Sequence, residues 1–338
     1  MISRAVLTRF AMAAALLLLA GCSGPQSALD PKGPEAHVLS NLFYVFLWVC
    51  IVVWVLIVAV LAWALARRRA PRPEPLVVDP GTDSRFRVIV TSLALFTGVT
   101  VVTLAVFSYA AQAQLFARPE AGVTIKVTGH QWWWEVAYDD PSPANTFTTA
   151  NEIHVPVGEP ITVKLTSADV IHSFWVPTLF GKMDAITGRE NQVQFTADKP
   201  GVYRGQCAEF CGLQHAHMAL VVFAEPREQF EAWKAAQLAP APQPANSAQQ
   251  AGLDVFLNNP CVSCHSIRGT SAGGRAGPDL THLAGRTTIA ADTLPFTRGA
   301  LGAWLIDPQS TKPGANMPMI QLSPDDLQVL LDYLESLK

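Results

Sequence analysis

Apolar residues near the N-terminus form three runs that differ in length. The first, about residues 10–20, is too short to cross a bilayer as a helix, whereas residues 42–66 and 88–111 are uncharged stretches of 25 and 24 residues. About 20 apolar residues are enough for a helix to span the hydrocarbon core. The pattern therefore predicts a hairpin of two transmembrane helices within residues 41–111.

Positive charges indicate how this hairpin is oriented. The segment between the two helices carries Arg67, Arg68, Arg69, Arg72, Arg85 and Arg87. Residues 23–41 contain only one lysine or arginine, Lys32. Because positively charged loops stay in the cytoplasm, we expect the turn to lie inside the cell. Both the N-terminus and the chain after about residue 112 should then lie on the periplasmic side of a bacterial inner membrane.

The first apolar run follows Arg4 and Arg9 and ends in the sequence "LLAGC". A positively charged start, a short apolar stretch and small residues before a cleavage point are typical of an exported protein. Residues 19–22 resemble a bacterial lipobox, which predicts a lipoprotein signal peptide over residues 1–21 and a lipid on Cys22. An ordinary signal peptide that contains a cysteine is the alternative. Residues 22–40 then form a periplasmic N-terminal segment.

From Val123 onward, apolar and polar residues alternate, as in Val123, Ile125 and Val127, with turn sequences such as "VPVGEP" and "DKPG" between the alternating runs. This pattern predicts a small antiparallel β-sandwich or barrel over about residues 120–230. After Trp233 the sequence "LAPAPQPANSAQQ" has no periodicity, which predicts an interdomain linker over residues 234–248.

Residues 249–338 predict a different, all-α unit. A short helix around residues 249–257 precedes a glycine-rich loop. A final helix over residues 324–338 has apolar residues at helical spacing, namely Leu327, Leu330, Leu331 and Leu334. Ser323 is the expected N-cap of this last helix. The formal net charge of the chain is −3, which gives no reason to expect a nucleic-acid partner.

The sequence Cys261-Val-Ser-Cys264-His265 carries the chemistry of this last unit. In a C-x-x-C-H sequence the two thiols bond to haem vinyl groups and the imidazole binds the iron. A disulfide and a zinc site are the alternatives, but no further set of cysteines and histidines lies nearby in the sequence to complete a zinc site. The pattern predicts covalently attached haem c, with a methionine from "KPGANMPMI" as the second ligand.

Residues 249–338 resemble a class I cytochrome c in this motif and in the later methionine. The residues implied to hold the haem are Cys261, Cys264, His265 and Met317. Met319 is the competing candidate for the second ligand, and the Pro278 carbonyl is implied to accept a hydrogen bond from the histidine ligand. His282 is interpreted as an ordinary surface or haem-edge histidine. The residues implied to form the crossing of the first and last helices are Gly252, Phe256 and Tyr333.

The segment "GQCAEFCGLQHAHM", residues 205–218, gathers two cysteines, two histidines, a glutamate and a methionine. A disulfide between Cys207 and Cys211 is the simplest interpretation in an oxidising compartment. It does not explain the neighbouring imidazole and thioether groups, which together with thiolates form the ligand set that copper prefers. His172 in "DVIHSFWVP" is the expected further ligand from another strand, and the second cysteine allows a second metal ion.

Four motifs make the resemblance of this region specific: "IHSFWVP", "GHQWWW", "GKMDAITGRENQ" and "YRGQCAEFCGLQHAHM". They resemble subunit II of the haem–copper cytochrome c oxidases over about residues 40–225, and with the attached cytochrome the chain resembles the caa-type subunit II. The resemblance implies a cupredoxin-like Greek-key sandwich that holds dinuclear copper A. The implied ligands are the side chains of His172, Cys207, Cys211, His215 and Met218 and the backbone carbonyl of Glu209.

The same resemblance implies roles for other residues. Electrons would enter the copper domain at Trp132 in "HQWWW", and the side chain of Glu209 would reach a magnesium or manganese ion shared with subunit I. His217 departs from the family pattern, so we interpret it as a packing or surface residue. The family often has a glutamate at the cytoplasmic start of the second helix, near a proton channel, and here the sequence offers only Asp83.

These observations predict the electron-input subunit of a bacterial terminal oxidase. Electrons from a cytochrome c or a membrane-bound cytochrome complex would reach haem c, then copper A, then subunit I, where oxygen is reduced to water and protons are pumped. The expected partners are subunit I, other oxidase subunits and the lipid bilayer. Two alternative hypotheses are the corresponding subunit of a nitric oxide reductase that uses copper A, and a membrane-anchored copper carrier.

Overall fold

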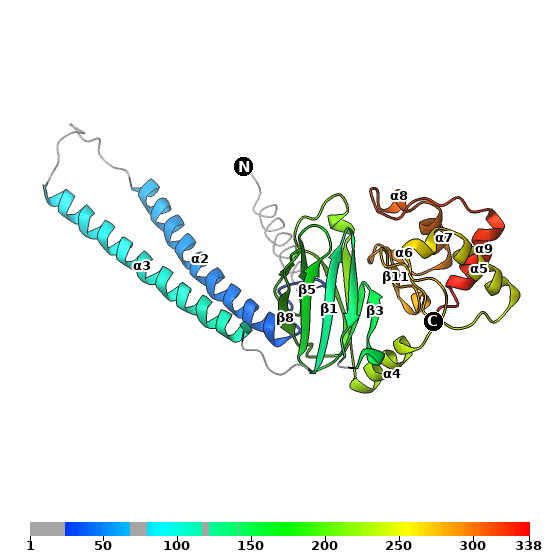
Figure 1. Ribbon diagram of the computed structural model, residues 1–338. Coiled ribbons are helices and arrows are strands. Elements are labelled where there is room, and N and C mark those ends of the chain that lie inside the picture. The colour runs from blue at the N-terminus through cyan, green and yellow to red at the C-terminus, as the bar shows by residue number, and fades with distance from the viewer. Residues whose placement is uncertain (1–23, 68–79, 117–121, 141) are drawn as a thin grey trace, which may run out of the picture. The chain divides into compact units, whose positions relative to one another are not determined.

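The computed structural model describes residues 24–67, 80–116, 122–140 and 142–338 (Figure 1). The predicted signal peptide and Cys22 lie outside these residues. The chain divides into two compact units. One of them, His37–Arg118, contains most of the two long helices, and the other contains the β-sandwich and the C-terminal helical domain.

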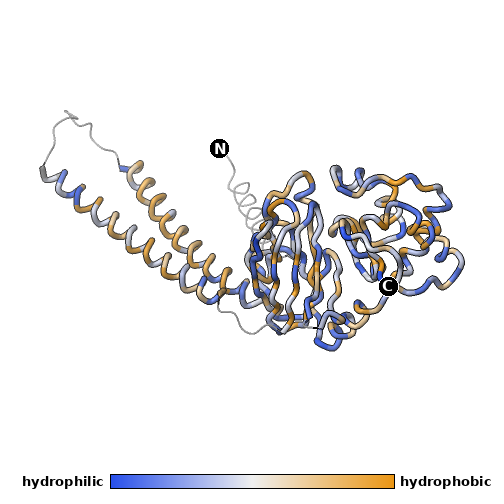
Figure 2. The backbone as a smooth tube through the Cα atoms, in the orientation of Figure 1, coloured by the Kyte–Doolittle hydropathy of each residue, from blue (hydrophilic) through white to orange (hydrophobic). Residues whose placement is uncertain are grey.

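Helices α2 (Pro34–Ala66) and α3 (Pro80–Phe116) contain the two predicted apolar spans. Both are long and apolar enough to cross a membrane, with mean hydropathy of 3.2 and 2.2. Figure 2 shows the hydrophobic colouring along most of their length. Each helix starts with proline and has an acidic residue in its first turn, Glu35 or Asp83, which suits the positive end of the helix dipole. Both helices are longer than the predicted apolar spans.

Two five-stranded sheets pack against each other as a β-sandwich (Figure 1). The first sheet has the order β3-β2-β1-β5-β8, with the bounds β1 Val123–His130, β2 Trp133–Tyr138, β3 Phe147–Ala150, β5 Ile161–Ser167 and β8 Asn191–Phe195. The second has the order β4-β10-β9-β6-β7, with the bounds β4 Glu152–Pro156, β6 His172–Trp175, β7 Met183–Ala185, β9 Gly201–Cys207 and β10 Ala219–Glu225. Alternate residues such as Ile125 and Val127 are fully buried between the sheets.

The sandwich is mixed, which corrects the expectation of a purely antiparallel fold. Strands β1 and β5 are parallel, and so are β4 and β10, whereas the other paired strands are antiparallel. The chain leaves the first sheet after β3, adds β4 to the second sheet and returns as β5 beside β1. A crossover of this kind brings strands of the same direction together, which a short hairpin cannot do.

Helix α4 (Arg227–Leu238) follows the last strand and packs on the sandwich. Phe230 on this helix is buried in the same apolar core as the strand residues, and Trp233 packs against that core. The helix continues to Leu238, so the first part of the predicted linker 234–248 is helical, which corrects that expectation. Alanine, glutamine and leucine favour helix at these positions, and the missing apolar periodicity did not prevent it.

The C-terminal domain is helical and has its own apolar core. Its elements are α5 (Ser247–Asn258), α6 (Cys261–Cys264), β11 (Thr288–Ile289), β12 (Leu294–Pro295), α7 (Arg298–Ile306), α8 (Pro308–Thr311) and α9 (Pro324–Leu334). Helices α5 and α9 pack against each other, which confirms the predicted crossing. A Cβ atom on Gly252 would lie 2.0 Å from the carbonyl oxygen of Val329, so the close approach requires glycine. Phe256 and Tyr333 are buried in this core.

A side-chain cap fixes the start of the last helix. The Ser323 hydroxyl accepts a hydrogen bond from the N–H of Asp326 at 3.0 Å, which confirms the predicted N-cap. Helix α9 ends at Leu334 and not at Lys338 as expected. The last residues form tighter turns, since the Ser336 N–H donates to the carbonyl of Tyr333, three residues earlier.

Candidate metal and haem sites

The ends of three neighbouring strands bring the predicted copper ligands together. Strands β10, β9 and β6 are adjacent in the second sheet, and β9 runs antiparallel to both neighbours. The end of β9 and the beginnings of β6 and β10 therefore meet at one edge, where Cys207, His172 and Met218 lie. The Cys207 N–H donates to the Met218 carbonyl at 2.8 Å and fixes this arrangement. The turn after β9 adds Cys211 and His215.

The side chains of these residues form one cluster. The sulfur atoms of Cys207 and Cys211 are 3.7 Å apart, and both thiols are free. Cys207 Sγ lies 3.9 Å from Nδ1 of His172 and 3.2 Å from the carbonyl oxygen of Glu209. Cys211 Sγ lies 3.6 Å from Nδ1 of His215 and 3.8 Å from the sulfur of the methionine before β10. The structure thus brings together all six predicted ligand residues.

The donor atoms of this cluster suit soft metal ions such as copper. A disulfide requires sulfur atoms about 2.05 Å apart, so the two thiols are available as ligands. One ligand atom each from His172, Cys207 and Cys211 lies within 4.8 Å of the others, and all three residues are buried. Thiolate, imidazole and thioether groups bind copper in preference to magnesium or calcium, which favour oxygen ligands. The residues therefore fit a copper centre.

The ring of His172 is held in a tight pocket. Its Nε2 atom lies 2.8 Å from Oδ1 of Asp169, and Trp134 packs edge-on against the ring with centroids 5.8 Å apart. A Cβ atom on Gly129 would lie 2.6 Å from Cδ2 of His172, so this position requires glycine. Because Nε2 contacts a carboxylate, Nδ1 is left to face the sulfur atoms, as a metal ligand must. Sequence reasoning missed Asp169, although its place three residues before His172 was a possible signal.

Electrostatic interactions make the two thiols unequal. The pKa of the Cys207 thiol is lowered, chiefly because of its hydrogen-bond contact with the Cys211 thiol. The pKa of Cys211 is raised, because its hydrogen bond to Cys207 and its burial both disfavour a second negative charge. Burial alone would lower the pKa of His172, but its contacts with Cys207 and Asp169 raise it. A metal cation bound by these residues would favour the ionised form of both thiols.

The three consecutive tryptophans take different places beside this cluster. Trp134 is fully buried and belongs to the apolar core of the sandwich. Trp132 is 8% exposed, and its indole N–H donates to the carbonyl of Cys211 at 3.0 Å. Trp133 stacks on the ring of His130, with centroids 4.4 Å apart. Trp132 is thus bonded directly to the backbone of a predicted copper ligand.

Two other residues of the loop have exposed side chains. The carbonyl of Glu209 faces the cluster, while its side chain is exposed. His217 is exposed, and its Nδ1 atom lies 2.8 Å from Oε1 of Gln214. Its contacts in the described structure do not include the sulfur atoms, and its exposure confirms the interpretation of His217 as a packing or surface residue.

Helix α6 carries the predicted haem-attachment sequence. Cys261 and Cys264 are free, half-buried thiols at the two ends of this helix. The Nδ1 atom of His265 lies 2.7 Å from the carbonyl of Pro278, which confirms the predicted hydrogen bond. When Nδ1 donates this bond, Nε2 keeps a lone pair for iron. Burial lowers the pKa of His265, which favours the neutral ring that binds a metal.

Glycines of the following loop pack directly against this sequence. A Cβ atom on Gly277 would lie 2.7 Å from Cε1 of His265, and one on Gly274 would lie 2.5 Å from the backbone carbon of Cys264. These approaches leave no room for a side chain, which explains the glycines at positions 274 and 277. Two free thiols one helical turn apart and an oriented imidazole fit a covalently attached haem.

The segment after helix α8 carries both candidate methionines. Met319 is 62% exposed, whereas Met317 is half-buried. The carbonyl of Met317 accepts a hydrogen bond from Nε2 of Gln309 at 3.1 Å, which fixes the backbone at this position. A ligand to a buried iron needs a side chain that faces the protein, so burial supports Met317 as the second ligand.

His282 is buried, which corrects its interpretation as a surface or haem-edge histidine. Its Nδ1 atom lies 3.0 Å from the carbonyl oxygen of Lys338, and its Nε2 atom lies 3.0 Å from the carbonyl oxygen of Ala239. The ring therefore ties the C-terminus of the chain to the segment that precedes the cytochrome domain. Both carbonyls come from distant parts of the chain, so no local pattern of residues indicated this role.

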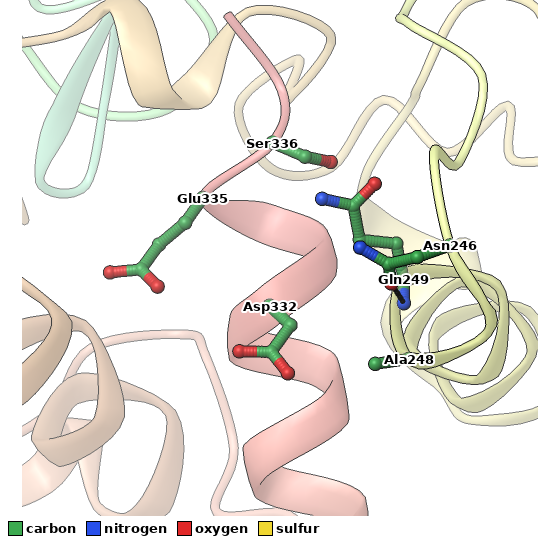
Figure 3. Close-up of a pocket in the computed structure, with 6 residues that line it drawn as sticks. All are labelled: Asn246, Ala248, Gln249, Asp332, Glu335 and Ser336. Carbon is green, nitrogen blue, oxygen red and sulfur yellow. Dashed lines mark hydrogen bonds between the residues drawn. The ribbon is translucent and has the colours of Figure 1, made fainter.

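An open polar pocket of about 380 Å³ lies between the start of α5 and the end of α9 (Figure 3). Its lining residues are Asn246, Ala248, Gln249, Asp332, Glu335 and Ser336. Asn246 caps α5 by accepting the N–H of Gln249 at 2.9 Å, and Asp332 and Glu335 both pair with Arg298. These polar groups serve helix capping and ion pairs, and the pocket includes none of the predicted site residues.

Two parts of the chain match known families. Residues 140–225 match the family described as "Cytochrome C oxidase subunit II, periplasmic domain", and residues 249–338 match the family described as "Cytochrome c". The chain is 35% identical over 329 residues to cytochrome c oxidase subunit 2 of Alkalihalophilus pseudofirmus, covering 95% of this chain and 94% of that protein. It is 27% identical over 342 residues to the same subunit of Bacillus subtilis, with 95% of each chain covered.

One solved structure is similar in sequence to part of the chain. The periplasmic domain of subunit II of cytochrome oxidase of Bradyrhizobium japonicum is 38% identical, with a TM-score of 0.32, and covers 35% of this chain and 95% of that chain.

The fold and the two clusters define a redox protein with an apolar helix hairpin, a cupredoxin-like domain and a cytochrome c domain. The chain belongs to the cytochrome c oxidase subunit II family and carries a fused C-terminal cytochrome c domain. It is therefore a subunit of a haem–copper oxidase, with a periplasmic domain and helices suited to a membrane. The subunit II periplasmic domain implies copper A, and the cytochrome c domain implies haem c.

Proposed function

We propose that this chain is the electron-input subunit of its oxidase and conducts electrons from its own cytochrome domain to its own copper domain. The observation that carries this proposal is the position of Trp132. Its indole N–H donates to the carbonyl of Cys211 at 3.0 Å. Its ring also faces the segment that leads to Met317, because a Cβ atom on Gly314 would lie 3.7 Å from the ring. One side chain therefore forms a hydrogen bond to the copper loop and lies beside the loop of the predicted haem ligand.

The copper domain would hold dinuclear copper A through the residues His172, Cys207, Cys211, His215 and Met218 and the carbonyl of Glu209. When bound, copper A shares one electron between two ions, so that little geometry changes on reduction. The strand ends hold these side chains in a buried cluster, and such rigid support favours rapid transfer. The exposed carboxylate of Glu209 is available for a magnesium or manganese ion shared with subunit I.

The cytochrome domain would hold haem c through the residues Cys261, Cys264, His265 and Met317. When bound by a histidine and a methionine, haem exchanges single electrons and has no open position for oxygen. The Pro278 carbonyl keeps the His265 ring oriented, and a cytochrome c or a membrane-bound cytochrome complex would be the donor. From copper A the electrons would continue to subunit I.

Other parts of the proposal concern the membrane and the partner subunits. The two apolar helices would span the membrane with both ends of the chain on the periplasmic side, and a lipid on Cys22 would add a further anchor. Subunit I would reduce oxygen to water and pump protons. Asp83 forms an ion pair with Arg87, one turn later in α3, at 2.7 Å.

The test is to purify the complex with its partner subunits and record its spectra and its turnover. We expect a near-infrared band from mixed-valence copper, a covalently attached haem on this chain, and oxygen consumption with reduced cytochrome c. Absence of the near-infrared band would contradict the copper A assignment and favour a copper carrier. Turnover of nitric oxide without turnover of oxygen would identify a nitric oxide reductase.

A further inference from the structure

Two buried charges lie where the cytochrome domain contacts the copper domain, and neither belongs to a predicted metal site. Within the described residues, Lys312 is the least exposed lysine or arginine, at 3%, and Glu152 is the least exposed acidic residue, at 4%. Lys312 belongs to the cytochrome domain, and Glu152 begins strand β4 of the copper domain. Burying a charge is costly unless it is well paired, so both positions call for an explanation.

The Nζ atom of Lys312 contacts three backbone carbonyls. It donates to the carbonyls of Trp132 and His217 at 2.8 Å each, and to that of Ala290 at 3.2 Å. An ammonium group has three hydrogens, so all of its donors are used. Burial lowers the pKa of Lys312 to about 7, so these three bonds must offset the loss of water. Two of the acceptors belong to the copper domain and one to the cytochrome domain, so Lys312 ties the two domains together.

Glu152 makes the reciprocal contact from the other domain. Its Oε1 atom accepts hydrogen bonds from the N–H of Thr287 at 2.7 Å, the hydroxyl of Thr287 at 2.6 Å and the N–H of Thr288 at 3.2 Å. Each domain therefore presents one buried charge to polar groups of the other. A carboxylate that accepts several such bonds is held firmly, because each bond to a charged group is stronger than a neutral one.

A strained turn lies between these two contacts. Ala290, Ala291 and Asp292 have φ angles of 55°, 57° and 60°, a left-handed conformation that residues other than glycine rarely adopt. Each of the three contacts a group at the interface. Ala290 accepts from Lys312, the carbonyl of Ala291 accepts the N–H of Ala219 at 3.2 Å, and Asp292 pairs with Arg204 at 2.6 Å. Strain of this kind persists where the surroundings enforce it, which here means the copper domain.

The start of the interdomain segment is also held in place. The guanidinium of Arg268 donates to the carbonyls of Gln237 and Leu238 at the end of helix α4. The N–H of Ala241 donates to the carbonyl of Arg268 at 2.9 Å. Arg268 of the cytochrome domain thus caps a helix of the copper domain. The segment up to Ala241 is therefore held against the cytochrome domain by hydrogen bonds.

We propose that Lys312 is a positioning residue that holds the cytochrome domain against the copper domain, so that the segment from Lys312 to Asn316 stays over Trp132. Nε2 of Gln214 donates to the carbonyl of Pro313 at 2.8 Å, and this second contact supports the same placement. The proposal deepens the proposed function and rests on it, because the docked arrangement matters only if electrons pass between the domains at Trp132. In the docked arrangement the cytochrome domain would not have to diffuse to the copper domain before each electron transfer.

The test uses the full chain in its complex with the partner subunits. Lys312→Met keeps the length of the side chain and removes all three hydrogen bonds. Lys338→Met is the matched control, because Lys338 is the other lysine of the cytochrome domain and is exposed. Glu152→Gln tests the reciprocal contact. Hydrogen exchange reports docking through the amides of Ala219, Thr287 and Thr288, which the interface protects.

We expect Lys312→Met to accelerate exchange at all three amides by about tenfold or more. The substitution removes three hydrogen bonds from a buried ammonium group and leaves three carbonyls without this donor. Glu152→Gln should accelerate exchange at Ala219, which it does not touch. Amides within helix α9 should exchange as in the wild type, and Lys338→Met should change nothing. Unchanged exchange in Lys312→Met would overturn the proposal, and so would equal acceleration in α9, because that result would mean that the cytochrome domain itself had unfolded.

A second readout tests the positioning role. An added photosensitiser with a sacrificial electron donor reduces the haem after a light flash, and the rate at which the haem is then reoxidised is measured. The copper and haem spectra of the resting protein are recorded separately. We expect slower transfer in Lys312→Met with both resting spectra unchanged. Faster exchange with unchanged transfer would overturn the positioning role. If the copper band is absent from the wild type, the proposed function fails, and the exchange result still decides whether Lys312 holds the domains together.

Discussion

In the copper domain most predicted ligands are buried and contact one another, whereas those of the cytochrome domain are half-buried and lie on separate segments. His172 and Met218 have no exposed surface, and Cys207 has only 2%. Cys261 and Met317, in contrast, are half-buried and lie far apart in the sequence. The strands of the β-sandwich therefore position the copper ligands. The haem ligands lie on separate segments, and the haem itself would fill part of the core between them.

The variant with the largest expected effect removes the copper site and leaves the haem site unchanged. Cys207→Ser removes one of the two thiolates, so we predict complete loss of the near-infrared copper band. The copper domain should stay folded, because its core contains many apolar residues from both sheets. The haem spectrum should not change. Near-infrared and visible spectra, together with circular dichroism of the same sample, check these outcomes, and a lost haem spectrum would show that the two sites are not independent.

The next variant affects only the cytochrome side. Met317→Ala should change the haem spectrum and lower the haem potential by on the order of 100 mV, because a thioether ligand stabilises reduced iron. Met319→Ala is the matched control, since Met319 is 62% exposed and should change neither property. The copper band should persist in both variants. The opposite pattern for the two methionines would show that Met319 is the ligand.

A third variant tests the contact between the two sides. Trp132→Phe removes the indole N–H that bonds to Cys211, and we expect electron transfer from haem to copper to slow by about tenfold, equivalent to roughly 1.4 kcal/mol in the barrier. Trp133→Phe is the control, because Trp133 stacks on His130 and is not bonded to the copper loop. Flash-induced transfer kinetics measure both. Equal rates in the two variants would remove Trp132 from the route.

Acid should weaken the copper domain through His154. Burial lowers the pKa of this histidine from 6.5 to about 3, and its ring is stacked between Phe223 and Trp233. The folded state therefore binds the proton less readily than the unfolded state, so stability is complete above about pH 6.5 and is lost as the pH falls towards 3. Glu225, whose pKa is raised by burial, offsets part of this loss.

We expect a loss of up to about 4 kcal/mol in the free energy of unfolding between these pH values, reduced by the opposing effect of Glu225. His154→Gln should flatten this dependence, because glutamine does not titrate. Thermal unfolding followed by tryptophan fluorescence measures it. A parallel loss of stability in the wild type and in His154→Gln would show that other groups cause the acid sensitivity.

The smallest expected effect concerns one cap in the cytochrome domain. Ser323→Ala removes the hydroxyl that accepts the N–H of Asp326, and we expect the domain to lose about 1 kcal/mol of stability. Ser271→Ala changes an exposed serine of the glycine-rich loop and should have little effect. Denaturant unfolding measures both, and an equal effect of the two changes would show that the cap does not stabilise α9.

Local patterns in the sequence predicted much of this molecule. The apolar spans, the C-x-x-C-H sequence and the N-cap at Ser323 depend on neighbouring residues, so the sequence contained each of them. The cysteine and histidine loop was equally local, and only His172 had to be supplied from another strand. The crossing at Gly252 came from the resemblance to the cytochrome family.

Contacts between distant segments could not be predicted in this way. The parallel pairing of β1 with β5 depends on a crossover between sheets, which alternation along one strand does not reveal. Lys312 is an isolated lysine in the sequence, and only the folded chain brings it to the carbonyls of Trp132 and His217. His282 is similar, because its two carbonyl partners are 43 and 56 residues away. Apolar periodicity carries no information about such polar contacts.

The central claim is that this chain passes electrons from its own haem to its own copper centre. The most direct measurement is flash reduction of the haem in the purified complex. The absorbance of the haem band and that of the near-infrared copper band are then recorded simultaneously. We predict that haem oxidation and copper reduction proceed at one common rate that does not depend on protein concentration. A rate that rises with concentration, or haem oxidation without a change in the copper band, would contradict the claim.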